Sequence, residues 1–300
     1  MKKFFRALWR VITFPFWLIY KIISFPFILI RNSIKFLNTD VEDRSILDTF
    51  TSLATEEQAR SSFWDHIEEL RMHLLRMVIG LAIGVGISFY FTTPLMEYLA
   101  RPVGGLSKLI AIQPTEEIGV FMRVALLSGI AIMLPYLAFE IWFFAAPGLT
   151  AREKKNTLLG IPLATILFLC GMAFTFYVLL PSAIPFLGNF TAITQDWRAG
   201  DYFGFVTGLM IWIGIFFEFP LVIYILTSIG LVKPSVLAKQ WRIAIVIISI
   251  IAAAVTPTVD PVNMGLVMIP MSLLYFISIG MSYIAYAGRK RNMSVTEESV

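Results

Sequence analysis

The sequence predicts an all-α polytopic membrane protein in which six transmembrane helices form a concave bundle. Its 300 residues are 58% hydrophobic and only 15% charged, whereas about 25% of the residues of a typical soluble domain are charged. The chain also contains six apolar runs, and a helix needs about 20 apolar residues to cross a bilayer. Because an open strand leaves its backbone unpaired in lipid, and no alternating pattern indicates a β-barrel, we expect each run to be helical.

The expected spans are Leu75–Thr93, Gly119–Ala145, Thr157–Leu180, Phe203–Ile229, Arg242–Thr256 and Met264–Ala287. The fifth has about 14 residues before Pro257, or about 21 Å of helix at 1.5 Å per residue. The bilayer should therefore thin there, or another helix should cover its end. Interior prolines remove a backbone donor and tend to kink a helix, and four spans carry one: Pro135, Pro162, Pro220 and Pro270. Bent and mismatched helices favour a concave bundle.

The distribution of basic residues predicts the orientation. Of the 24 Lys and Arg residues, 20 lie before the first span, in alternate connections or after the last span. The other side carries only Arg101, Lys108, Arg123 and Arg198. By the positive-inside rule both termini are cytoplasmic, and this scattered pattern favours membrane orientation over nucleic-acid binding. The single cysteine, Cys170, excludes an intrachain disulfide.

The first 61 residues differ from the rest. Residues 1–38 are basic and aromatic, and the related stretches Ile12–Ile19 and Ile23–Ile30 repeat at a spacing of eleven residues. That spacing is close to three helical turns, so both copies share a face, as expected for a segment lying in the cytoplasmic interface. A signal peptide or a seventh span is the alternative, although Pro15 and Pro26 interrupt the apolar run. We expect residues 39–61 to be a polar linker, 62–288 the six-helix domain and 289–300 a cytoplasmic tail.

A polar motif precedes the first span. Ser62 and Asp65 have capping-box spacing, which predicts that an amphipathic helix begins at Ser62. On this helix a solvated face is the simplest interpretation, with Glu68 paired to Arg71 at i,i+3 and Glu69 paired to His73 at i,i+4. His66 and Glu69 lack a second ligand pair, so no metal site is expected.

Thr150 and Glu153, in the connection before the third span, again have capping-box spacing. The functional alternative is that Glu69 and Glu153 are two exposed cytoplasmic carboxylates that recognise a cationic peptide. A guanidinium group offers a carboxylate two parallel hydrogen bonds, which lysine cannot reproduce.

Two acidic residues lie within spans, and a third lies in an external turn. Glu218 lies well inside the fourth span, where a carboxylate costs about 2.5–3.5 kcal/mol on insertion scales, and Pro220 leaves a carbonyl unpaired beside it. Its alternatives are a functional acid or a neutral interhelical hydrogen bond. Glu140 lies nearer the cytoplasmic end of its span, and we expect it to snorkel outward. Asp260 lies in a tight external turn, where an ordinary turn role is equally consistent.

Enzymatic signatures are absent: the sequence has no phosphate loop, no H-E-x-x-H and no G-x-S-x-G motif. We therefore expect neither an enzyme nor a cofactor, and any active transport must draw on an ion gradient or on partners.

Several motifs, in chain order, resemble the TatC family. They are His66–Arg71, Phe143–Leu149 followed by Glu153, and Phe217–Pro220. Pro102 and the stretch Gln113–Glu116 fit the family's first external loop, and Ile269–Met271 fits its last span. The resemblance covers residues 63–286, approximately the whole chain after the linker. Two departures are His73, where a further basic residue is frequent, and Asn263-Met264 in place of a common Ser-Gln pair.

TatC is the multispanning receptor subunit of the twin-arginine (Sec-independent) protein translocase. The resemblance implies a six-helix, cup-shaped and self-associating receptor in the prokaryotic plasma (inner) membrane. It also implies that this receptor binds twin-arginine signal peptides of folded cargo. It also implies recruitment of single-span TatA-type and TatB-type subunits, and use of the proton-motive force. By position, the implied site residues are Glu69 and Glu153 with Arg71 and Phe144 for the signal peptide, Glu218 facing the cavity, and Pro102 and Asp260 outside.

The competing interpretation is a proton-coupled small-solute secondary transporter that uses Glu218. Such transporters often have related halves with paired broken helices, but Glu218-Phe-Pro has no counterpart around the first span. An intramembrane hydrolase is disfavoured because the sequence offers no nucleophile–base pair.

Overall fold

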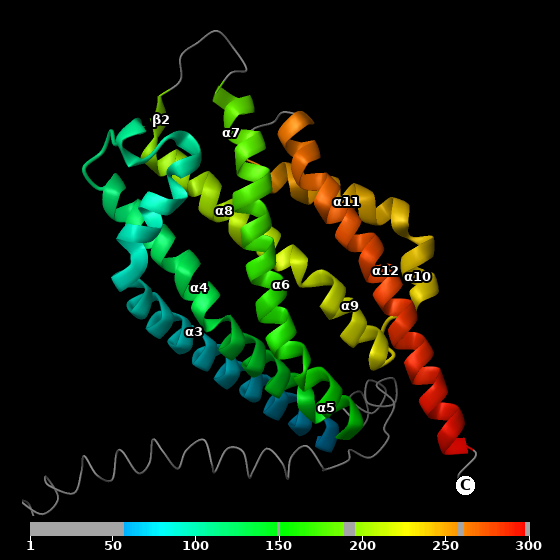
Figure 1. Ribbon diagram of the computed structural model, residues 1–300. Helices are drawn as coiled ribbons and strands as arrows, with labels where there is room; N and C mark the ends of the chain where they lie inside the picture. The colour runs from blue at the N-terminus through cyan, green and yellow to red at the C-terminus, as the bar shows by residue number, and fades with distance from the viewer. Residues whose placement is uncertain (1–56, 149–150, 189–195, 257–260, 298–300) are drawn as a thin grey trace, which may run out of the picture.

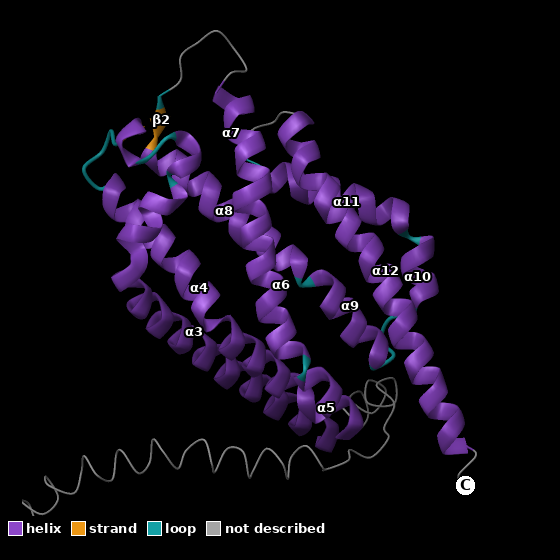
Figure 2. Ribbon diagram, in the orientation of Figure 1, coloured by secondary structure: helices purple, strands orange, loops and turns teal. Residues whose placement is uncertain are grey.

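The computed structural model describes residues 57–148, 151–188, 196–256 and 261–297 (Figure 1). Within these ranges the chain is helical almost throughout (Figure 2). The predicted interfacial segment, and the linker up to residue 56, lie outside the described residues. The all-α polytopic class is confirmed, whereas the concave outline stays a prediction.

In the part of the chain that the structure describes, five stretches are long and apolar enough to cross a membrane: Ile67–Val103, Glu116–Ala145, Gly160–Gly188, Ala199–Ser228 and Met264–Gly288. They belong to α3 (Glu57–Leu99), α4 (Glu116–Ala145), α6 (Gly160–Phe174) with α7 (Leu180–Gly188), α8 (Ala199–Phe217) with α9 (Phe219–Ser228), and α12 (Pro261–Glu297). The remaining expected span, the fifth along the chain, is α11 (Trp241–Val255), which has 15 residues. At 1.5 Å per residue it is about 22 Å long, so it is short, as the sequence predicted.

Short elements connect these helices. The connection between α3 and α4 contains the 3-10 turns η1 (Arg101–Val103) and η2 (Leu106–Lys108) and the strand β1 (Leu109–Ile110). The other connections contain η3 (Ala146–Gly148), α5 (Ala151–Leu158), β2 (Trp197–Arg198) and α10 (Pro234–Lys239), and a π-helical stretch, η4 (Thr175–Leu179), joins α6 to α7.

Both ends of the helical domain differ from the expected boundaries. The first helix, α3, already runs from Glu57, so the helix start expected at Ser62 is wrong. Residues 57–60 (Glu-Gln-Ala-Arg) are strong helix formers, and their propensity outweighs the capping signal. The same helix continues past Thr93 to Leu99. At the other end, α12 extends to Glu297, so most of the expected tail continues the last helix.

The four prolines that were expected to kink their spans divide into two groups. Pro135 and Pro270 lie inside α4 and α12, as predicted. Pro220 instead lies in the first turn of α9, because the expected fourth span is two helices that meet at Glu218. A proline costs no intrahelical hydrogen bond in the first turn. Pro162 likewise lies in the first turn of α6, which begins after a break at Leu159.

Small residues allow α3 and α4 to pack closely. A Cβ added to Gly84 would lie 2.9 Å from the carbonyl oxygen of Gly129, and one added to Gly129 would lie 2.8 Å from the backbone nitrogen of Val85. In the same interface Ser88 Oγ donates a hydrogen bond of 2.7 Å to the carbonyl of Ala125. Close approach through small residues and a polar contact is the usual way in which membrane helices associate.

Two further close contacts join α6 to α8 and α9 to α12. A Cβ on Gly171 of α6 would lie 2.8 Å from the Cα of Gly214 in α8. Thr227 of α9 and Ser282 of α12 share a buried hydrogen bond of 2.7 Å. Helix α8 supplies much of the buried core, including Tyr202, Phe203, Val206, Leu209 and Ile213.

Candidate functional site

Three of the segments predicted to be cytoplasmic lie at one end of the molecule. Figure 1 shows the beginning of α3, helix α5 and the end of α12 at the bottom, and α7, β2 and the beginning of α12 at the top, whereas α10 lies at mid-height on the right. This arrangement matches an even number of crossings between the two ends of the helical domain.

Glu69 lies on the exposed surface of α3 at this lower end. Arg71 lies two residues further on, and its Nη1 donates to Glu68 Oε1 at 3.3 Å, which confirms the predicted i,i+3 pair. The two side chains are 77% and 62% exposed, and a pair so exposed contributes little to stability. The stretch of α3 around Glu68, Glu69 and Arg71 therefore presents a charged, solvated face.

Glu153 belongs to α5, but its side chain and Thr150 lie outside the described residues. The rest of α5 is held against α4, because Trp142 Nε1 donates to Thr157 Oγ1 at 2.9 Å, and Thr157 in turn donates to the carbonyl of Lys154 at 3.3 Å. Lys154 itself is only 2% exposed. The helix that carries Glu153 is thus docked on the end of α4.

Glu140 is buried, at 6% exposure, so the expectation that it snorkels outward is wrong. Its Oε2 lies 2.6 Å from Nδ1 of His73, which is 3% exposed. The His73 ring also contacts Phe143 and Phe144, with ring centroids 5.5 Å and 6.1 Å away. This contact between α3 and α4 removes the need for the carboxylate to reach water.

Glu218 lies at the break between α8 and α9 and is partly buried. Within the described part of the chain, its Oε1 and the hydroxyl of Ser272 on α12 are buried without a hydrogen-bond partner. An unsatisfied buried polar group is destabilising, so a native structure that keeps one invites a functional explanation. Glu218 and Glu140 therefore have different surroundings, and only Glu218 retains an unpaired oxygen.

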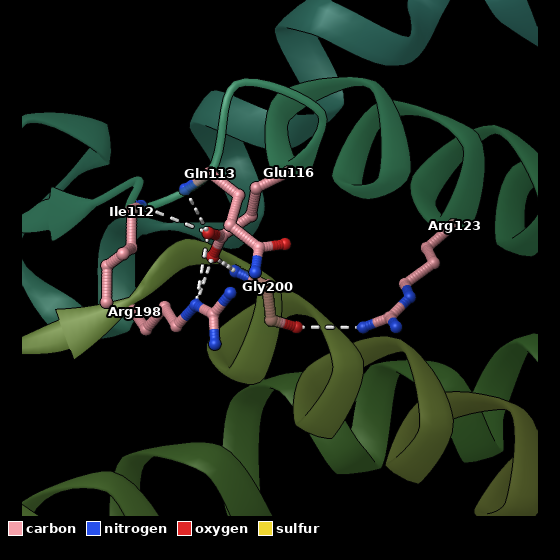
Figure 3. Close-up of polar contacts among 6 residues, drawn as sticks. All are labelled: Ile112, Gln113, Glu116, Arg123, Arg198 and Gly200. Carbon is pink, nitrogen blue, oxygen red and sulfur yellow. Dashed lines mark hydrogen bonds and ion pairs between the residues drawn. The ribbon is translucent and has the colours of Figure 1, made fainter.

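A polar cluster at the opposite end was not predicted. Glu116, at the start of α4, is 9% exposed, and its carboxylate accepts hydrogen bonds from the backbone of Gly200 at 2.6 Å and from Arg198 Nε at 3.0 and 3.1 Å (Figure 3). The backbone nitrogens of Ile112 and Gln113 also donate to it, at 3.1 and 3.4 Å. One carboxylate thus joins the loop before α4 to the start of α8.

The backbone pairing beside this cluster is a parallel two-stranded sheet, in which Leu109 faces Trp197 and Ile110 faces Arg198. A Cβ on Gly200 would lie 2.8 Å from Glu116 Oε1, so the contact requires glycine there. In the sequence, Glu116 was marked only as the end of the stretch Gln113–Glu116 that fits the first external loop of the family.

The other external residues can be placed only in part. Pro102 lies in η1, which is followed by Gly104 with a positive φ of 97°. Asp260 lies outside the described residues. Among the described side chains, no group of three or more His, Cys, Asp or Glu is arranged to hold a metal.

Comparison with known proteins points to one family. The family model for the Sec-independent protein translocase protein (TatC) matches residues 65–270. A TatC protein of Deinococcus radiodurans is 34% identical over 238 residues, covering 76% of this chain and 88% of that protein. A TatC protein of Synechocystis sp. is 33% identical, with 78% and 96% of the two chains covered.

A solved structure described as the twin arginine translocase receptor TatC also resembles the fold. It superposes with a TM-score of 0.66 at 33% identity and covers 73% of this chain and 99% of that one. The matched region contains the three motifs identified in the sequence, together with the α3–α4 and α8–α9 elements that carry them. The chain therefore belongs to the TatC family of Sec-independent protein translocase proteins.

Proposed function

We propose that this protein is the receptor and core subunit of a twin-arginine translocase, and that it binds the paired arginines of signal peptides on folded cargo. The observation that carries the proposal is the exposed Glu69 at the start of α3, within a motif that matches the family. Glu153 on α5 is the second carboxylate, with Arg71 and Phe144 beside them. The protein acts as a receptor, and catalysis has no part in the proposal.

The chemistry favours arginine. A carboxylate accepts two parallel hydrogen bonds from a guanidinium group, whereas a lysine ammonium offers a single point of charge. Two carboxylates on separate elements, α3 and α5, fit two neighbouring arginines, and Phe144 supplies an aromatic surface against which a guanidinium group stacks. Membership of the TatC family and the location of both elements at one end of the molecule support this assignment.

The proposal includes the cellular setting. The excess of basic residues before the first span, in alternate connections and after the last span supports cytoplasmic termini, and the family supports the prokaryotic inner membrane. The partners are single-span TatA-type and TatB-type subunits, further copies of this chain and membrane lipid, and export is driven by the proton-motive force. Residues 1–38 add a basic interfacial segment that adheres to the cytoplasmic leaflet.

The test is a binding experiment. A peptide that begins with two arginines is expected to bind the detergent-solubilised protein, and a two-lysine version is expected to bind far more weakly. Fluorescence anisotropy of labelled peptides at fixed ionic strength measures both affinities. Equal affinities for the wild-type protein would contradict the proposed recognition.

Glu218 distinguishes this function from the competing secondary transporter. In the receptor, Glu218 serves as a hydrogen-bonding group within the membrane, so Glu218→Gln is expected to support export of a folded reporter better than Glu218→Ala. In a proton-coupled transporter the group must titrate, and Gln would then be as damaging as Ala. Initial export rates of a twin-arginine reporter in cells that carry each variant, normalised to the amount of inserted protein, measure the difference.

A further inference from the structure

We propose that His73 and Glu140 are positioning residues that hold the two halves of the signal-peptide site in register. The inference rests on the proposed function and deepens it, because it concerns two buried residues that do not themselves reach the peptide. What carries it is a polar contact between α3 and α4 placed one helical turn behind the proposed recognition residues on both helices.

The spacing on each helix is the first argument. His73 follows Glu69 by four residues on α3, and Glu140 precedes Phe144 by four residues on α4. Residues four apart lie one above the other on the same side of a helix. Any axial shift or rotation of α3 against α4 at the His73–Glu140 contact is therefore transmitted to Glu69 and Phe144.

The geometry of the contact is the second argument. His73 Nδ1 and Glu140 Oε2 are 2.6 Å apart, with side chains only 4% and 8% exposed. A short hydrogen bond between two side chains so buried has a narrow range of acceptable arrangements, and leaving either partner alone strands a buried polar group. The pair thus specifies one register, whereas apolar packing tolerates several.

The aromatic neighbours are the third argument. The His73 ring contacts the rings of both Phe143 and Phe144, so the same imidazole that fixes α3 against α4 also supports the aromatic side of the proposed site. Further along the same interface, the Ser88–Ala125 hydrogen bond joins the two helices without reaching these rings. The two polar contacts of one interface are therefore expected to have different roles.

The experiment compares the two contacts. The ratio of two-arginine to two-lysine peptide affinity is measured for the wild type, His73→Ala, Glu140→Ala and Ser88→Ala, together with thermal unfolding in detergent. Mutations of residues that couple two sites change the coupling by about 2- to 30-fold. We therefore expect His73→Ala and Glu140→Ala each to lower the affinity ratio by about tenfold. Ser88→Ala is expected to lower the Tm but to leave the ratio unchanged.

Conservative rescue separates positioning from a general loss of structure. Glu140→Gln keeps an oxygen that accepts a hydrogen bond from the histidine and is expected to retain most of the ratio. The exchanged double variant H73E/E140H restores a pair and is expected to recover a ratio that the single variants lose. A ratio in His73→Ala equal to that of the wild type, or a loss that follows the Tm across all variants including Ser88→Ala, would overturn the inference.

A second readout needs no peptide. In a Cys170→Ala background, spin labels are attached at Met72→Cys on α3 and Ile141→Cys on α4, positions that are 43% and 59% exposed in the native chain. The dipolar broadening of the spectrum reports the separation of the two helices, and we expect His73→Ala to broaden its distribution or shift it. A wild-type protein that fails to prefer arginine refutes the proposed function, whereas an unchanged spectrum in His73→Ala refutes the positioning role alone.

Discussion

Replacing either Glu69 or Glu153 with alanine is expected to abolish the preference for paired arginines while the protein still inserts in the membrane. A hydrogen bond to a charged group contributes about 1.5–3 kcal/mol, which corresponds to a loss of about 10- to 150-fold in affinity for the two-arginine peptide. Affinity for the two-lysine peptide should change much less, because lysine does not use the paired geometry. Peptide titrations with each purified variant measure both effects.

The matched control for this experiment is Glu68→Ala. Glu68 carries the same charge one residue before Glu69, is exposed, and already pairs with Arg71, so its loss changes the local charge without removing the proposed contact. The preference for arginine should survive in this variant. Export of a folded reporter at the wild-type rate by Glu69→Ala or Glu153→Ala would count against the two-carboxylate site.

The large-scale fold follows from local properties of the sequence. Apolar runs of sufficient length mark the spans, because a polar group in lipid is costly wherever it occurs. The same logic identifies α11 as short, since its length is fixed by Arg242 at one side and Pro257 at the other. The helix ends are less predictable, as α3 and α12 show, because strong helix formers continue a helix beyond the apolar stretch that needs it.

The polar contacts inside the fold depend on tertiary structure instead. His73 and Glu140 are 67 residues apart in the chain, and Glu116 and Arg198 are 82 apart. In the sequence each residue has a plausible local role: Glu140 snorkelling, His73 pairing within its own helix, Glu116 in a turn. Only the packing of α3 on α4 and of α4 on α8 brings their true partners within reach, and no helical or strand period encodes such a pairing.

In the candidate site, too, the sequence identifies residues with a local signal but not the residues that support them through tertiary contacts. Glu69, Glu153 and Phe144 were identified because their motifs are local and resemble a family, and Glu218 because an acid within a span is conspicuous on its own. What supports those residues was not identified. Pro220 illustrates the difference: the sequence predicts a disturbance at this point, but whether the helix kinks or ends at Glu218 depends on how α8 and α9 pack against their neighbours.

The polar cluster around Glu116 is expected to contribute strongly to the stability of the protein. Glu116→Ala removes the acceptor for three backbone N–H groups and for Arg198 at once. Since these donors lie on the loop before α4 and at the start of α8, their release should free both segments together. We expect Glu116→Ala to lower the Tm in detergent markedly and to speed hydrogen exchange at residues 109–113 and 197–200.

The control is again an adjacent carboxylate. Glu117 is exposed and follows Glu116 on α4, so Glu117→Ala removes one negative charge from the same turn and is expected to leave both the Tm and the exchange rates unchanged. Glu116→Gln keeps an acceptor oxygen but weakens the contact with Arg198, because a charge-assisted hydrogen bond is about twice as strong as a neutral one. Its Tm and its exchange rates should therefore lie between those of Glu116→Ala and Glu117→Ala. Because the cluster lies at the end of the molecule opposite α5, peptide affinity measured below the unfolding range should be the same in all three variants.

A Tm for Glu116→Ala equal to that of Glu117→Ala would show that the two external segments are held by their packing alone. A lowered peptide affinity in Glu116→Ala would instead show that the two ends of the bundle are coupled.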